Sequence, residues 1–192
     1  MSLEDWNQRY AAGEQLFETP APLVQEFAGP LQPGAALDLA CGPGRNALFL
    51  AERGWSVTAV DGSPIAIDLL RQRARRKNLN IDLRVADLER GEYQISPGAF
   101  DLIVDSYYLQ RDLIPAMQRG VREGGTIIAI VHLADPDQPH GTPTRATPGE
   151  LRTYFAGWTI LHDFEGQPRE SCHRRAVAEI VARKPSHAPA EV

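Results

Sequence analysis

The sequence is poor in cysteine and has no long apolar run, and each scarcity removes a class of protein. Two cysteines, Cys41 and Cys172, are too few for a disulfide framework, and they lack the spacing of metal ligands. No apolar run approaches the ~20 residues of a membrane span. The first residues lack the basic and apolar pattern of a signal segment. We therefore expect a cytoplasmic protein with no structural metal and no membrane contact.

Positive charge is also scarce. The formal net charge is −5, whereas nucleic-acid-binding proteins usually have a basic surface, so we expect no nucleic-acid partner. With 192 residues, 43% of them hydrophobic and 23% charged, the composition is that of one folded domain. We predict a single domain over residues 1–184, as a monomer or a homodimer, followed by a flexible tail at 185–192.

Apolar strand-like runs alternate with helical patterns, which predicts an α/β fold with a mainly parallel sheet. One helix is predicted over Asn46–Arg53, and another opens on Ser63 and Pro64, a capping hydroxyl followed by a proline. Residues 1–30 are predicted to form a helical cap or lid, and residues 135–148 a long functional loop. The predicted strands are Ala36–Ala40, Ser56–Val60, Ile81–Ala86, Asp101–Asp105, Thr126–Val131, Thr159–Phe164 and Ala176–Ala182.

A glycine loop follows the first predicted strand. Gly42 and Gly44 let the backbone pass close to a ligand, and Asp61, at the end of the next strand, lies where a nucleotide-type ligand offers its ribose hydroxyls. Asp38 would be awkward beside a pyrophosphate but suits an ammonium group. S-adenosylmethionine has an ammonium group and a ribose but no phosphate. The sequence therefore predicts this cofactor.

Two other functions stay open at this point. A nicotinamide-dependent oxidoreductase shares the glycine loop, but the chain has only two lysines, Lys77 and Lys184, and no Tyr-x-x-x-Lys pair. A protein that binds S-adenosylmethionine without catalysis would have the same donor site. Calorimetry and turnover assays distinguish these alternatives.

The motifs resemble those of class I S-adenosylmethionine-dependent methyltransferases, in the right order and spacing. The resemblance implies a Rossmann-like, doubly wound sheet of seven strands, mainly parallel, with the last strand antiparallel. It also implies a methyltransferase activity. The matching segments are Leu37–Asn46, Val57–Asp61, Val85–Leu88, Phe100–Asp105 and the turn Gly124-Gly125-Thr126 into the fifth strand.

Finer details are similar to the tellurite-resistance type within that superfamily. They are Cys-Gly-x-Gly-Arg-Asn at 41–46, Trp-x-x-Arg-Tyr at 6–10 and the pair His173-Arg174. The closing strand follows this pair at once, whereas the tellurite enzymes carry a longer insertion. The acceptor we expect is a small molecule, with a thiol, selenium or tellurium nucleophile that needs little help from a general base.

The positions of the motifs and the chemistry of methyl transfer suggest roles for individual residues. Arg45 either binds the methionine carboxylate or lies in solvent, Asp87 either contacts adenine or caps a turn, and His132 is a further candidate substrate contact. Asp105 opens a segment faintly similar to the acidic Pro-Pro-aromatic motif of amino-group methyltransferases, but both prolines are absent. The predicted catalytic residues are Asp105, His173 and Arg174. The predicted cofactor-binding residues are Tyr10, Asp38, Ala40, Gly42, Gly44, Arg45, Asn46, Asp61, Gly62, Ser63, Asp87, Leu88 and Asp105.

Overall fold

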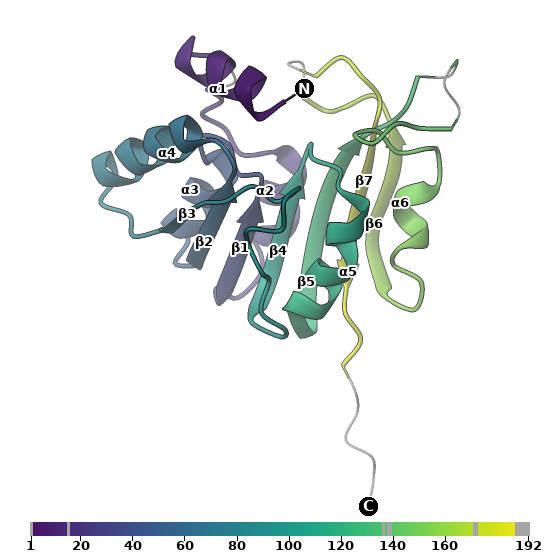
Figure 1. Ribbon diagram of the computed structural model, residues 1–192. Helices are drawn as coiled ribbons and strands as arrows, with labels where there is room; N and C mark the ends of the chain where they lie inside the picture. Colours follow the sequence, from purple (N-terminus) through teal and green to yellow (C-terminus); the bar gives the residue numbers. More distant parts are fainter. Residues whose placement is uncertain (1, 15, 136, 138–139, 171–172, 187–192) are drawn as a thin grey trace, which may run out of the picture.

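The computed structural model describes residues 2–14, 16–135, 137, 140–170 and 173–186 (Figure 1). Most of the predicted tail, residues 187–192, lies outside this range. The centre is a seven-stranded sheet with the order β3-β2-β1-β4-β5-β7-β6. Its strands are β1 (Ala35–Leu39), β2 (Ser56–Asp61), β3 (Asp82–Val85), β4 (Phe100–Ser106), β5 (Val121–His132), β6 (Thr159–Gly166) and β7 (Val177–Arg183).

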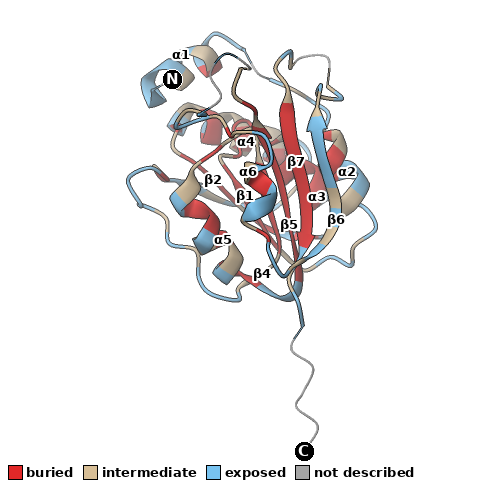
Figure 2. Cartoon of the chain, turned by 90° about the vertical axis from the view of Figure 1, so that its right-hand side faces the viewer, coloured by how far each residue is buried: buried red, intermediate tan, exposed pale blue. Residues whose placement is uncertain are grey.

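The last strand, β7, runs antiparallel to both of its neighbours, β5 and β6, while the other pairs are parallel. The predicted sheet, with seven strands and an antiparallel last strand, is confirmed. Figure 2 shows β7 buried along most of its length and β6 more exposed at the edge. Apart from Glu179, the buried residues of β7 are apolar, as expected of a strand that is covered on both faces.

Helices cover both faces of the sheet. Successive side chains of a strand point to opposite faces, and in β5 a run of consecutive residues is buried, so both faces must be covered. Ile128 belongs to a buried cluster that includes residues of α2, α3 and α4, whereas its neighbour Ile127 belongs to a second cluster that includes residues of α5 and α6. The helices are α1 (Leu3–Ala11), α2 (Pro22–Ala28), α3 (Arg45–Glu52), α4 (Pro64–Arg76), α5 (Ile114–Gly120) and α6 (Glu150–Thr153), with a 3₁₀ turn, η1, at Arg111–Leu113. In the part of the chain that the structure describes, no helix is long and apolar enough to cross a membrane.

The start of β5 differs from the prediction. The strand begins at Val121, which pairs with Phe100, and the register then shifts so that Thr126 pairs with Leu102. Gly124, with φ +73°, lies in this irregularity rather than in a turn before the strand. The apolar pattern begins only at Thr126, so pattern alone placed the strand too late.

Candidate functional site

Buried carboxylates gather at the carboxyl ends of β1, β2 and β4. Asp38, Asp61 and Asp105 are only 1%, 8% and 4% exposed. The strand β1 lies between β2 and β4, so the chain leaves the centre of the sheet in both directions. In open α/β sheets, ligands bind in the crevice at such a switch point.

Asp38 has an unsatisfied oxygen. Its Oδ2 is buried and has no hydrogen-bond partner, while the carboxylate accepts the backbone N–H of Ala47. Burial raises the pKa of Asp38 to about 7, and the N–H of Ala47 and the charge of Arg45 oppose that rise. A buried acceptor without a donor is costly. An ammonium group beside Oδ2 would satisfy it, so this residue fits the predicted cofactor.

Asp61 joins two loops. Its Oδ2 accepts the N–H of Gly42 at 2.7 Å, and its Oδ1 accepts the N–H of Ser63 at 2.8 Å. Each carboxylate oxygen can accept a second hydrogen bond, which leaves capacity for ribose hydroxyls. Burial raises the pKa of Asp61, and the two backbone N–H groups oppose the rise.

The glycine loop requires glycine for two reasons. Gly42 and Gly44 have φ of +53° and +82°, a region that side chains disfavour. A Cβ on Gly44 would lie 2.1 Å from Cδ1 of Leu70, and one on Gly42 would lie 3.1 Å from the hydroxyl of Tyr10. The loop is therefore packed from both the α4 side and the N-terminal side.

The helix α1 lies beside α4, over the carboxyl edge of the sheet (Figure 1). Asn7 accepts a 2.5 Å hydrogen bond from the hydroxyl of Ser63, and Leu3 lies against Gly62. Tyr10 is buried and stacks on Trp6, with ring centroids 5.6 Å apart. The predicted N-terminal helix thus covers the loops that carry the predicted ribose site.

Arg73 of α4 connects the glycine loop to the segment that follows α1. It donates hydrogen bonds to the carbonyls of Pro43, at 2.8 Å, and Phe17, at 3.0 Å, and it pairs with Glu18. The glycine loop and the segment after α1 therefore share one guanidinium. No local pattern indicated this role, because residues 17 and 73 meet only in the folded chain.

Arg45 is paired rather than solvated, so the solvent alternative is wrong. Its guanidinium contacts both oxygens of Glu170, at 2.5 and 3.2 Å, and both side chains are largely buried. Tyr107 donates its hydroxyl to the same carboxylate at 2.5 Å. Cofactor binding by Arg45 stays a prediction. Glu170 was not among the predicted residues, because no motif marks it.

Other predicted cofactor residues also have structural partners. The side chain of Asn46 accepts the N–H of Ala21 and donates to Ser106. Asp87 accepts the N–H groups of Glu89 and Arg90, at 3.0 and 3.3 Å, so it does cap a turn. Adenine contact by Asp87 and the neighbouring, buried Leu88 stays a prediction.

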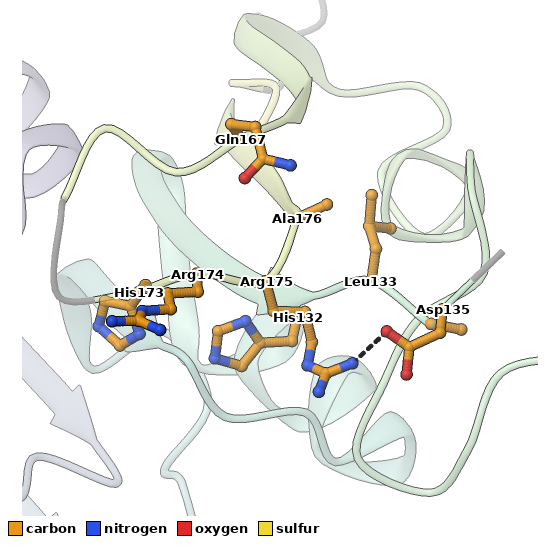
Figure 3. Close-up of a pocket in the computed structure, with 9 residues that line it drawn as sticks. His132, Leu133, Asp135, Gln167, His173, Arg174, Arg175 and Ala176 are labelled. Carbon is orange, nitrogen blue, oxygen red and sulfur yellow. Dashed lines mark hydrogen bonds and ion pairs between the residues drawn. The ribbon is translucent and has the colours of Figure 1, made fainter.

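A separate cavity of about 590 Å³ lies beyond the ends of β5 and β7 (Figure 3). Two of the three predicted catalytic residues, His173 and Arg174, line it together with His132, the further candidate substrate contact. Asp105 does not line it; its Oδ1 is buried without a hydrogen-bond partner elsewhere at the end of β4. The cavity is lined by His132, Leu133, Ala134, Asp135, Gln167, His173, Arg174, Arg175 and Ala176.

The two histidines of this cavity are electrostatically alike. Nδ1 of His132 and Nε2 of His173 are buried without hydrogen-bond partners. Burial, together with His173, Arg175 and Arg145, lowers the pKa of His132 to about 4, and burial also lowers the pKa of His173. Both rings are therefore neutral at pH 7. His173 stacks on Tyr107 at 3.7 Å, which places the cavity beside the end of β4.

Comparisons with known proteins agree with this geometry. The family model of the tellurite resistance protein TehB matches residues 15–173. The probable S-adenosyl-L-methionine-dependent methyltransferase TehB of Haemophilus influenzae is 29% identical over 147 residues, which are 72% of this chain and 50% of that protein. The thiopurine S-methyltransferase of Aliivibrio salmonicida is 26% identical over 182 residues, covering 83% and 85%.

The crystal structure of TehB from Haemophilus influenzae superposes with a TM-score of 0.75 at 25% identity, covering 93% of this chain and 67% of that one. The chain spans about half the length of the curated TehB relative that it matches. The match over most of the chain, the shared fold and the glycine loop confirm the predicted resemblance. The chain therefore belongs to the TehB family of class I S-adenosylmethionine-dependent methyltransferases.

Proposed function

We propose that this protein transfers a methyl group from S-adenosylmethionine to a small-molecule acceptor that carries a soft nucleophile. The observation that carries the proposal is the unpartnered, buried Oδ2 of Asp38 beside the glycine loop. A second site for the acceptor is available in the cavity at the ends of β5 and β7. The family to which the chain belongs also supports S-adenosylmethionine as the methyl donor.

The residues divide between holding the donor and covering it. Asp38 would accept a hydrogen bond from the amino group of the cofactor's methionine part. Asp61 would accept hydrogen bonds from the ribose hydroxyls, and Asp87 one from the adenine amino group. Tyr10 and the rest of residues 1–30 would form a cap within a single methyltransferase domain over residues 1–184. Orientation of the two reactants alone can lower the barrier by about 7–11 kcal/mol.

A sulfur acceptor suits the cavity and balances chemically. The bound cofactor supplies an electrophilic methyl group on a sulfonium sulfur. The acceptor's sulfur lone pair forms the new S–C bond, and the electron pair of the broken bond stays on the donor sulfur. The thiol proton leaves first, to water, because the lowered pKa values of His132 and His173 make both imidazoles weak bases. The thiopurine S-methyltransferase relative is named for a sulfur acceptor.

Cofactor affinity should depend on pH through Asp38. Its pKa of about 7 in the unliganded protein means that the carboxyl is largely protonated below that pH. An ammonium partner favours the carboxylate, so binding releases a proton and affinity rises with pH by up to ~10-fold per unit below pH 7. Stability has the opposite sign. Burial favours the protonated carboxyl of Asp38, so its contribution to the stability of the unliganded fold is fully present below pH 3.8, the value of the unfolded chain. That contribution decreases as the pH rises and is lost above about 7, the pKa of Asp38 in the folded protein.

Calorimetric titration with S-adenosylhomocysteine at pH 5.5, 6.5 and 7.5 measures this dependence. The product is suitable because it keeps the amino group and the ribose. The Asp38→Asn variant is the control and should flatten the profile. An equally steep profile in that variant would assign the proton to another group.

The activity itself is tested with the donor and with acceptors side by side. We expect micromolar binding of S-adenosylmethionine and S-adenosylhomocysteine and none of NADH, followed by methylation of thiols in a mass-spectrometric assay. Binding of NADH alone would favour an oxidoreductase. Tight donor binding without turnover on thiol, selenite or tellurite would favour a protein that binds the donor without catalysis.

A further inference from the structure

We propose that the acceptor is an organic anion, a thiol-type nucleophile that also carries a carboxylate or a similar acid group, rather than a small inorganic oxyanion. The inference rests on the proposed function, because it concerns the acceptor cavity of the same enzyme. It is carried by the size of the cavity, by its charge and by the two unpartnered imidazole nitrogens.

The size of the cavity argues for an organic molecule. Its volume of about 590 Å³ falls within the ~300–1,000 Å³ that is typical of sites for drug-sized ligands. An oxyanion of four heavy atoms needs on the order of 100 Å³, about three times the share of one water in the liquid. Leu133, Ala134 and Ala176 also give the wall apolar surface, which an oxyanion would not use.

The charge of the cavity argues for an acid group on that molecule. Asp135 lies between two guanidiniums, accepting from Arg145 at 2.8 Å and from Arg175. Arg174 lines the same cavity, and within the described part of the chain it has no ion-pair partner. Two arginines, Arg174 and Arg175, therefore line the cavity with a single carboxylate, Asp135, and an anionic ligand would balance the excess positive charge (Figure 3).

The imidazoles argue for a protic group on the same molecule. His132 and His173 are neutral, and each has a buried nitrogen without a hydrogen-bond partner. Their ring centroids are 5.5 Å apart, so both can face one bound molecule. A thiol S–H can donate to a neutral imidazole, while its carboxylate pairs with an arginine.

Arg111, which does not line the cavity, anchors the segment that follows Asp135. Arg111 donates to the backbone carbonyls of Thr142 and Arg145, at 2.8 and 3.1 Å, and pairs with both oxygens of Glu150. Ala146 in turn donates its N–H to the carbonyl of His132. This anchoring favours a preformed cavity, which suits a ligand of defined shape.

The test compares matched ligands on the protein saturated with S-adenosylhomocysteine, so that binding is measured without turnover. Calorimetry is run with 4-(mercaptomethyl)benzoate and benzyl mercaptan, which differ only in the carboxylate, and with selenite and tellurite. We expect the carboxylate thiol to bind at least ~10-fold more tightly than the other three ligands. Arg174→Gln should remove most of that preference and leave the affinity for S-adenosylhomocysteine unchanged.

The control is Arg152→Gln, which removes an exposed arginine of α6 that pairs with Asp163 outside the cavity. It should keep the preference. Equal binding of the two thiols, or tighter binding of selenite or tellurite, would overturn the proposal. Absence of S-adenosylhomocysteine binding would instead refute the proposed methyltransferase function, so the two failures are distinguishable.

Discussion

Replacing Gly44 with alanine is expected to lower the free energy of unfolding by about 2–5 kcal/mol. The left-handed φ of +82° costs a residue with a Cβ about 1–2 kcal/mol. The new methyl group would lie 2.1 Å from Cδ1 and 2.8 Å from Cγ of Leu70, which is fully buried, so a rotation of one terminal methyl group does not relieve the contact. Overpacking of this kind costs about 1–3 kcal/mol more. Urea denaturation followed by circular dichroism measures the change.

Gly157→Ala separates the two causes. Gly157 has a nearly equal φ of +80°, but a Cβ there would meet nothing within 4 Å. This control variant should lose only about 1–2 kcal/mol, the backbone part of the cost. Equal losses in the two variants would show that Leu70 does not constrain the glycine loop.

Replacing Asp61 with alanine is expected to weaken binding of S-adenosylhomocysteine by ~1–3 kcal/mol, the cost of unpaired ribose hydrogen bonds. The change also removes the acceptors for the N–H groups of Gly42 and Ser63, so the β1–α3 and β2–α4 loops lose their common partner. Calorimetry measures the affinity, and thermal unfolding shows how much of the loss reflects a looser fold.

Asp68→Ala is the matched control, because it removes an exposed acid of the neighbouring helix α4 that pairs only locally with Arg71. It should leave the affinity unchanged. Affinity in the Asp61→Ala variant equal to that of the unaltered protein would refute the placement of the ribose at this carboxylate.

The glycine loop and the strands around it were predictable because their signals are local. An apolar run, two glycines and an acid at a strand end depend on neighbours a few residues away. The predicted strands therefore match the observed ones closely, apart from β5. There the residues Val121 and Phe100 pair across a register shift that has no local signature.

The donor site was only partly predictable. Sequence alone selected Asp38 and Asp61, but it could not show that one oxygen of Asp38 lacks a partner while both oxygens of Asp61 already accept backbone N–H groups. Such facts depend on which backbone groups approach the carboxylates in three dimensions. Arg45 illustrates the same limit, since its partner Glu170 lies 125 positions away.

The sequence by itself determined the order of the strands along the chain, the helices that follow β1 and β2, the glycine loop and the kind of donor that fits it. The reason is that these features follow from side-chain periodicity and from the backbone freedom of glycine. The tertiary structure alone decided how α1 covers the loops, which atoms stay unpartnered and where the acceptor cavity lies. That cavity joins the end of β5 to the start of β7, segments more than 40 residues apart that meet only because β7 inserts beside β5.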